Sequence, residues 1–464
     1  MKTFGLITGL IFGGIVFFLP IEGLNYQSQT VFAVFIVAAS WWVWNVLPPW
    51  ATGFVMMASW AVFAGVPVQE ILLPFSSDIL WFILATLFLS SAMTRTGLAD
   101  RFGLILLKRL PGNIFWIVFS FFITAIVLSP AIPANSLQAV IMAPIALGIL
   151  ESSGLRPKSP EAAYVGLGFM ISVSTLSGVL PTSGIHSLIV ASLLPSWYYW
   201  NWSSWLIRSI PVAAFTIGVT ILLLGPVLGA RICDIPKNNI IVKELEKKGP
   251  LIASKKEVYL IVLFIGVLIF VFTAGFHKLP YTSLGLIMIL FIFIFRILDE
   301  KEMFASVDWG LWLWIGSITS IGNVFPKYHL DQWMISLVEP TLIRVLNISP
   351  VYFVILLVLF CYVGRFFITA WTAFAAVSFT ALLPATISLG IDPLTVGLVL
   401  LMSMNPFFFP FQNVSCAICE GMQKEKWWLP GQRFRVALMW CLVNLIALIV
   451  GTFYWVKAGF FFRS

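Results

Sequence analysis

Charge is the scarcest property of this 464-residue chain. Asp, Glu, Lys and Arg make up only 10% of it, whereas 60% of its residues are hydrophobic. A soluble domain of this composition would expose apolar surface everywhere, and no polar stretch is long enough to fold as a separate soluble domain. Apolar runs long enough to span a bilayer recur along the whole chain. The composition therefore predicts an all-α membrane protein with many spans.

Histidine and cysteine are scarce as well, with three and five residues respectively. No zinc motif such as His-Glu-x-x-His accompanies them, which argues against an intramembrane enzyme. Cys416 and Cys419 have the spacing of a redox or metal pair, but no second pair lies nearby in the sequence, so we expect small buried residues there. The net charge of +8 lies in loops, and it predicts membrane orientation rather than nucleic-acid binding.

The apolar stretches predict eleven transmembrane helices plus two re-entrant hairpins. Residues 4–20 resemble a signal peptide, but they lack a convincing cleavage site and more spans follow at once, so we interpret them as a helix. The predicted crossings are residues 4–20, 28–47, 50–66, 79–93, 161–194, 204–229, 258–275, 282–298, 309–323, 394–419 and 434–455, and the hairpins are residues 113–154 and 348–390.

Helix breaks at bilayer depth are the strongest functional signal. The stretch 113–154 is too long for one crossing and is interrupted by Pro130 and Pro133, which predicts two half-length helices that meet at a tip. The crossing 161–194 is interrupted around Gly184 and should unwind midway. At this depth, backbone N–H and C=O groups without hydrogen-bond partners are tolerated only where protein buries them or where they line a water-filled cavity. The tips and breaks therefore predict where a substrate is held.

The two halves of the chain repeat one order of elements: three crossings, a hairpin, a broken crossing and a final crossing. Each half contributes five full crossings, an odd number, so the halves enter the membrane from opposite sides and form inverted repeats. We therefore expect a leader helix (1–27), a first inverted repeat (28–230), a cytoplasmic linker (231–257) and a second inverted repeat (258–464).

Loop charges orient this arrangement. Lysine and arginine concentrate in loops that fall on one side of the membrane, including Lys243 and Lys247 in the linker. The aromatic loop from Trp197 to Trp200 carries no charge and falls on the other side. The positive-inside rule then places the amino terminus in the cytoplasm, in a multi-pass protein of the inner (plasma) membrane.

This orientation predicts the outcome of a labelling experiment. An impermeant thiol reagent applied to intact cells should modify a cysteine introduced at position 200 and spare one introduced at position 247. The opposite pattern would overturn the assignment of inverted repeats.

The chain resembles the divalent anion/sodium symporter family, and the resemblance covers nearly its whole length. It rests on the element order and on several motifs, among them Pro20-Ile-Glu-Gly-Leu24, Phe75-Ser-Ser-Asp78 and Gly97-Leu-Ala-Asp-Arg101. The family usually carries Ser-Asn-Thr at each hairpin tip. The first tip here reads Ala134-Asn135-Ser136, so one Asn and one hydroxyl are kept.

The second tip departs from the family pattern. Counting back from Pro384 places the motif on Phe374-Ala375-Ala376, whereas counting back from Gly390 places it on Ala370-Trp371-Thr372. Neither alternative preserves Ser-Asn, which weakens the case for several coupled sodium ions and favours exchange, proton coupling or fewer ions.

The candidate substrate-binding residues lie at these tips and breaks: Asn135, Ser136, Ser183, Gly184, His186, Arg365, Trp371, Thr372, Asn413 and Ser415. Half-helix N-termini and Asn or hydroxyl donors suit a dehydrated anion, whereas sodium needs oxygens, for which Asn135, Ser136 and Ser183 are candidates. Each residue has a structural alternative. Asn135 and His186 can be buried structural groups, and Arg365 can snorkel to the surface or pair with a carboxylate.

The resemblance implies a secondary active transporter of a small carboxylate, sulfate or sulfonate anion, sodium-coupled or exchanging. It further implies an elevator-type movement of the hairpin-bearing domain and a homodimer in the lipid membrane. A passive anion channel with the same fold is the alternative, and it differs in that no solute gradient would drive another solute uphill.

Overall fold

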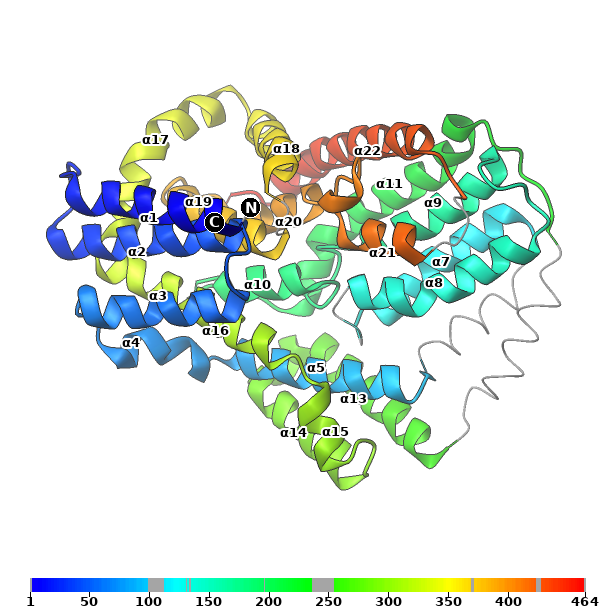
Figure 1. The fold of residues 1–464 in the computed structure, drawn as a ribbon, viewed down its shortest axis with the longest axis horizontal. Coiled ribbons are helices and arrows are strands. Elements are labelled where there is room, and N and C mark those ends of the chain that lie inside the picture. Colours follow the sequence, from blue (N-terminus) through cyan, green and yellow to red (C-terminus); the bar gives the residue numbers. More distant parts are fainter. Residues whose placement is uncertain are drawn as a thin grey trace.

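The computed structural model describes residues 2–98, 112–130, 132, 135–195, 197–235, 254–368, 371–422 and 427–462, and over these it is nearly all helical (Figure 1). Extended pairing within the described residues is limited to two isolated bridges, Asn113 with Asp234 and Ile391 with Phe462. The expected all-α class is confirmed. Most of the predicted linker, including Lys243 and Lys247, and the motif residues Asp100 and Arg101 lie outside the described residues.

The helices follow the predicted order along the chain. The first half forms α1 (Lys2–Phe18), α2 (Tyr26–Val43), α3 (Pro49–Phe63), α4 (Val68–Leu72), the 3-10 helix η1 (Leu73–Ser76), α5 (Asp78–Arg95), α7 (Ile114–Leu128), α8 (Asn135–Ser152), α9 (Pro160–Ser174), α10 (Ile185–Leu193) and α11 (Trp202–Leu228). The second half forms α13 (Lys255–His277), α14 (Tyr281–Ile294), α15 (Glu300–Ser306), α16 (Trp309–Lys327), α17 (Leu330–Ile348), α18 (Pro350–Phe367), α19 (Trp371–Ser388), α20 (Pro393–Ser403), the 3-10 helix η2 (Pro410–Gln412), α21 (Val414–Met422) and α22 (Pro430–Lys457).

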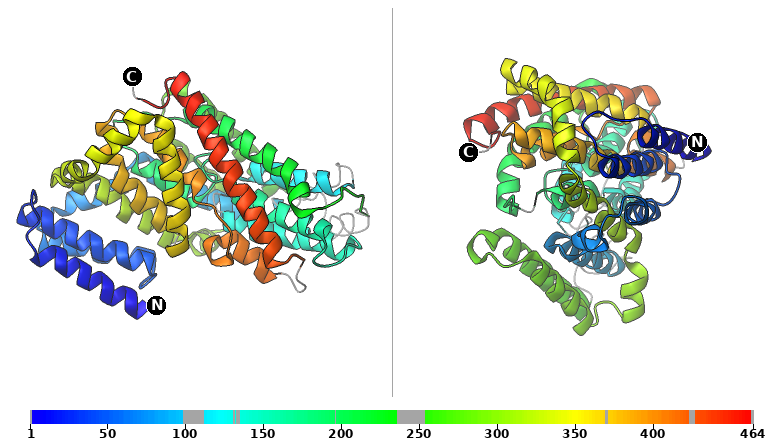
Figure 2. Two further views of the ribbon diagram at one scale, coloured as in Figure 1. Left: turned by 90° about the horizontal axis from the view of Figure 1, so that it is seen from above. Right: turned by 90° about the vertical axis from the view of Figure 1, so that its left-hand side faces the viewer.

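Several of these helices are suited to a bilayer. Six are long and apolar enough to cross a membrane, namely α5, α11, α13, α18, α19 and α22, and shorter apolar helices include α7, α8 and α20. The long helices α11 and α22 run side by side (Figure 2). A membrane protein with many spans is therefore confirmed, while the number eleven stays a prediction.

Local sequence signals start the helices that frame the breaks. Ser159, Ser349 and Asp392 each precede a proline, which occupies the first helical position of α9, α18 and α20. Their side-chain oxygens accept hydrogen bonds from the backbone N–H groups of Ala162 (3.2 Å), Val351 (3.2 Å) and Thr395 (2.9 Å), respectively. These caps satisfy donors that have no partner within the helix. Proline is tolerated at the first position because the N–H that it lacks would have no partner within the helix.

The two broken crossings exchange partners at their breaks. Before its break, the first crossing (α9) packs against α7 and α8, but after the break α10 packs against α19. The second crossing does the reverse, since α20 packs against α18 and α19 while α21 packs against α8. The helix pair α7–α8 and the helix pair α18–α19 thus each contact one segment of each crossing.

One long helix was not expected. The predicted elements leave residues 324–347, with Lys327 and His329, as a loop, which is wrong: Lys327 lies in the last turn of α16 and His329 caps α17. Pro340 and the charged residues Asp331 and Arg344 interrupt the apolar run of α17, so its composition does not resemble a membrane span. Its helical state depends on packing against α16, α18 and α19.

A buried ion pair ties three segments together at the start of α20. Arg208 of α11 lies 3.5 Å from the carboxylate of Asp392, with exposed side-chain fractions of 12% and 7%. The Tyr198 hydroxyl donates to the same carboxylate oxygen (2.6 Å), and the guanidinium sits 4.4 Å from the Phe460 ring centroid. An ion pair this well covered is costly to break, because the remaining charge stays buried without its partner.

We therefore expect Asp392→Asn, which keeps the side-chain shape, to lower the free energy of unfolding by about 3–5 kcal/mol. The matched control is Arg95→Gln, which breaks the exposed pair Arg95–Glu302 (side chains 43% and 39% exposed) and should cost less than about 1 kcal/mol. Thermal unfolding of the purified protein in detergent measures both. Equal shifts for the two variants would contradict the structural role of the buried pair.

Candidate functional site: a polar cluster at the helix breaks

The ends of the two helix pairs decide which residues face the breaks. The pair α7–α8 is joined between Leu128 and Asn135, with Ala134 outside the described residues. The pair α18–α19 is joined between Phe367 and Trp371, with Ala370 outside the described residues. Trp371 and Thr372 therefore open α19, whereas Phe374 to Ala376 lie one turn inside it. Of the two alternatives for the second tip, the one counted back from Gly390, which assigns the tip to Ala370-Trp371-Thr372, agrees with this start of α19.

Asn135 is the first residue of α8 and is 5% exposed. Its side-chain amide donates to the backbone oxygen of Val173 (2.8 Å) in the last turn of α9 and to the hydroxyl of Ser177 (3.4 Å) just after this helix. Its Oδ1 is buried and has no hydrogen-bond partner among the described residues. The donor half of this amide thus holds the helix pair to the broken crossing, while the acceptor half remains available to a ligand.

His186 joins the first break to the second helix pair. Its ring stacks on Trp371, with centroids 4.3 Å apart and planes 18° apart, and it is 2% exposed. Its Nε2 has no hydrogen-bond partner within the described part of the chain. Gly184 lies between His186 and Asn135, since a Cβ at Gly184 would be 2.3 Å from Cε1 of His186 and 2.7 Å from Oδ1 of Asn135. The close approach leaves no room for a side chain at residue 184.

Arg365 is fully buried, at 0% exposure. Its guanidinium donates to the backbone oxygen of Ile368 (2.5 Å) and to that of Gln412. It therefore connects the end of α18 to the break between α20 and α21, and it does not snorkel to the surface. This contact parallels the one that Asn135 makes to Val173 at the other break.

The second break carries several buried amides and hydroxyls. Oδ1 of Asn413 accepts from the N–H of Cys416 (3.2 Å) and from the Ser174 hydroxyl (3.4 Å), so this break touches the end of α9. The Asn413 Nδ2, the Ser415 Oγ and the Gln412 Nε2 are buried with no hydrogen-bond partner among the residues described. Unpaired buried polar atoms are expensive in an apolar interior, and their concentration at one place indicates a site for a polar ligand or water.

The remaining candidates differ in their freedom to bind. The Ser183 hydroxyl donates to the backbone oxygen of Leu180 (2.8 Å) and accepts from its N–H (3.2 Å), so it stabilises its own turn. Ser136 and Thr372 are half-buried in the first turns of α8 and α19. The residues proposed for sodium are Asn135, Ser136 and Ser183. Of these, Asn135 has a side-chain oxygen that is buried and has no hydrogen-bond partner among the described residues.

Asn405 was not recognised as a candidate. It is 1% exposed, and both its Oδ1 and its Nδ2 lack hydrogen-bond partners among the described residues. Gln412, whose backbone oxygen accepts from Arg365, was not selected either. The signal for Asn405 was present in the sequence, because an Asn before Pro406 inside a membrane crossing marks a helix end at bilayer depth.

The chemistry available here is that of amides, hydroxyls, backbone groups and one guanidinium. In the described ranges, no group of three or more His, Cys, Asp or Glu could hold a metal ion. Cys416 and Cys419 are buried free cysteines, as expected. Four helices, α8, α10, α19 and α21, begin at these breaks and tips, and helix N-termini present free N–H groups and positive dipole ends to an anion.

The fold is shared with solved membrane transporters. The YdaH transporter of Alcanivorax borkumensis superposes with a TM-score of 0.59 at 12% identity, over 99% of this chain and 98% of that one. MtrF of Neisseria gonorrhoeae, described among antimetabolite efflux pumps, superposes with a TM-score of 0.57 at 14% identity, over 98% and 94%. The chain thus shares the fold of these two proteins.

The family follows from the sequence. The model of the sodium:sulfate symporter transmembrane region matches residues 1–460, and the chain belongs to this family. A putative malate transporter, YflS, of Bacillus subtilis is 23% identical over 99% of this chain and 97% of its own. The L-tartrate/succinate antiporter of Escherichia coli is 20% identical over 97% and 91%, respectively. The family resemblance expected from the motifs is confirmed.

The crowding around Gly184 gives a stability prediction. Gly184→Ala places a methyl group against His186 and Asn135, so we expect it to lower the midpoint of thermal unfolding, as overpacking typically costs about 1–3 kcal/mol. Gly218→Ala is the matched control, because a Cβ there meets nothing within 4 Å and alanine favours the helix. If Gly184→Ala were as stable as Gly218→Ala, the close packing of the first break against Asn135 and His186 would be refuted.

Proposed function

We propose that this chain is a secondary transporter of small anions, with dicarboxylates as the favoured substrate class. The observation that carries the proposal is the polar cluster at the helix breaks, where unpaired amide and hydroxyl atoms, a buried guanidinium and four helix N-termini meet in an apolar interior. The printed names of relatives, a putative malate transporter and an L-tartrate/succinate antiporter, support the carboxylate class. The family description leaves sulfate as a second anion to test.

The proposed architecture has eleven crossings, two re-entrant hairpins and two inverted repeats, with the boundaries predicted from the sequence. Support comes from the parallel sets of helices, since α7 to α11 match α18 to α22 in order. A proline also lies inside each of α8 and α19, at Pro144 and Pro384. A glycine with a positive φ angle follows each of these helices, at Gly154 and Gly390. The exchange of partners at the two breaks is what two interlocked repeats would produce.

We also propose an elevator-type movement of the hairpin-bearing helices, a homodimer and a cytoplasmic amino terminus in the inner (plasma) membrane. The family membership supports the movement and the dimer. The distribution of lysine and arginine in the loops supports the orientation.

The coupling proposal follows from the difference between the two breaks. Sodium requires oxygens, and unwound backbone supplies them. In the second half, the Arg365 guanidinium donates to the backbone oxygens of Ile368 and Gln412, so a fixed cation already occupies oxygens of this kind. In the first half, Oδ1 of Asn135 has no partner among the described residues. We therefore propose exchange, or coupling to at most one sodium ion.

Asn135 supplies the test of the site. We expect Asn135→Ala to abolish uptake in proteoliposomes of whichever labelled anion the wild type carries, because the variant loses both the contact to Val173 and the free Oδ1, groups worth about 1–3 kcal/mol each when buried. Asn347→Ala, at an exposed position of α17, is the control and should transport normally. Unchanged uptake by a folded Asn135→Ala protein would remove the first helix pair from the binding site.

Sodium titration tests the coupling. Initial uptake rates at increasing sodium concentration should follow a Hill coefficient of about one, or show no sodium dependence and require a counter-substrate instead. A Hill coefficient of about two or more would show that the second break binds sodium despite Arg365.

A further inference from the structure

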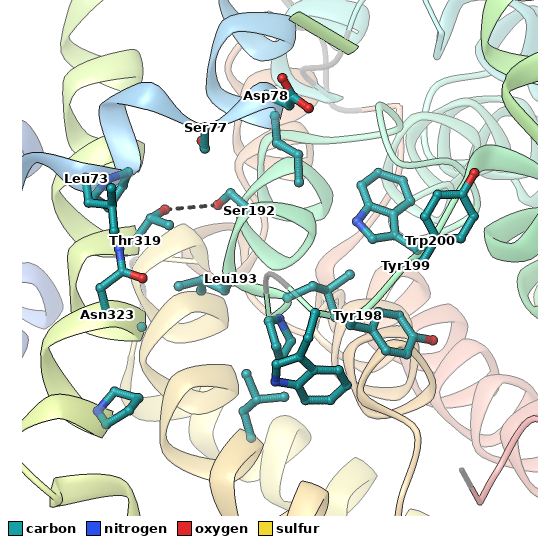
Figure 3. Close-up of a pocket in the computed structure, with 18 of the residues that line it drawn as sticks. Leu73, Ser77, Asp78, Ser192, Leu193, Tyr198, Tyr199, Trp200, Thr319 and Asn323 are labelled. Carbon is teal, nitrogen blue, oxygen red and sulfur yellow. Dashed lines mark hydrogen bonds between the residues drawn. The ribbon is translucent and has the colours of Figure 1, made fainter. Parts of the chain in front are cut away.

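A large cavity lies apart from the polar cluster. Its volume is about 1050 Å³, the upper end of the usual range for ligand pockets, and none of Asn135, His186, Arg365 or Trp371 lines it. Figure 3 shows its wall, with Ser192 at the end of α10 and Tyr198 to Trp200 in the following loop. Ser192 follows His186 by six residues on one helix, so the cavity begins roughly 9 Å along the helix axis from the stacked rings.

The cavity is lined by helices that carry the polar cluster and by helices that do not. One wall comes from the end of α10 and from Thr380 and Pro384 of α19, the helices that begin next to His186 and Trp371. The other part of the lining, called here the second wall, comes from the start of α5, from α16 and from Asp331 of α17. The hydroxyls of Ser192 and Thr319 bridge the two walls at 3.2 Å (Figure 3).

The lining does not suit an anion. Its charged residues are Asp78, Asp331 and Lys278, so carboxylates outnumber the single ammonium group. Oδ1 of Asp331 is buried and has no hydrogen-bond partner among the described residues. Thr380 is 7% exposed, and its hydroxyl likewise lacks a partner in the described part of the chain. Aromatic residues, including Trp197 and Trp200, also line the cavity, and aromatic side chains attract cations.

We propose that this cavity binds a hydrophobic organic cation, such as an ammonium that carries alkyl or aryl groups, and that the bound cation inhibits transport without competing with the anion. The carboxylate of Asp331 attracts the charge, while the aromatic and aliphatic walls cover the apolar groups. Inhibition follows because the ligand contacts both walls and holds α10 and α19 against α16 and α17. This last step rests on the proposed transport function, whereas binding does not.

Binding is measured first, on the purified wild-type protein in detergent, so that it is independent of transport. Tetrabutylammonium should raise the midpoint of thermal unfolding, because a ligand of the native state stabilises it, and tetramethylammonium should not, because it is too small to reach both walls. The Asp331→Asn variant should bind tetrabutylammonium about tenfold more weakly, as expected when a charge-assisted contact is lost. Glu300→Gln, at an exposed acidic position of α15, is the matched control and should bind like the wild type.

Uptake in proteoliposomes supplies the second readout. Tetrabutylammonium should lower the maximal rate and leave KM for the anion unchanged, and Asp331→Asn should transport normally but resist the inhibitor. A raised KM at an unchanged maximal rate would place the ammonium in the anion site and overturn the proposal. Absence of stabilisation by tetrabutylammonium, or equal binding by Asp331→Asn and Glu300→Gln, would also overturn it, even if the protein proved not to transport anions.

Discussion

The structure depends on how polar groups are satisfied where helices end inside an apolar molecule. Each broken crossing releases backbone groups that no helix pairs, and each is held by a side chain from a neighbouring helix pair: Asn135 donates to Val173 at the first break, and Arg365 donates to Gln412 at the second. Without these donors the carbonyl oxygens would be buried without partners, which costs several kcal/mol per group in apolar surroundings. The Ser174–Asn413 hydrogen bond joins the two breaks, and the stack of His186 on Trp371 joins the first break to α19. The polar groups that the helix ends leave behind are thus gathered in one site.

The two halves meet this requirement with different chemistry. The amide of Asn135 is neutral and keeps an acceptor oxygen without a partner among the described residues, whereas the guanidinium of Arg365 carries a permanent charge and has donors only. A cation has an oxygen to bind on the first side and meets a fixed positive charge on the second. An anion between them would face a permanent positive charge on one side, which is why the asymmetry between the halves bears on substrate and coupling alike.

The sequence predicts the features that depend on local signals. Long apolar runs locate the helices, and cap residues such as Ser159 and Asp392 mark where they begin, because these effects act within one turn. The helix α17 was missed because its state depends on tertiary packing rather than on its own composition. The start of α19 was ambiguous because counting back from Pro384 and counting back from Gly390 give different residues for the second tip, and a single sequence does not decide between them.

The site was predicted in part. Asn135, His186 and Arg365 are polar residues in apolar stretches and were found for that reason. Their partners Val173, Trp371 and Gln412 are set by the fold. Asn405 was missed although it precedes Pro406 within a predicted crossing.

The central claim is that the polar cluster binds an anion in a cycle that couples one solute flux to another. Counterflow measures this directly: proteoliposomes loaded with unlabelled dicarboxylate are diluted into a trace of labelled dicarboxylate, and the internal label is followed over time. A coupled transporter predicts that the label rises transiently above its external concentration, driven by the outward gradient of the unlabelled anion. A label that only approaches its external concentration, at a rate independent of the unlabelled anion inside, would show passive conduction and contradict the account.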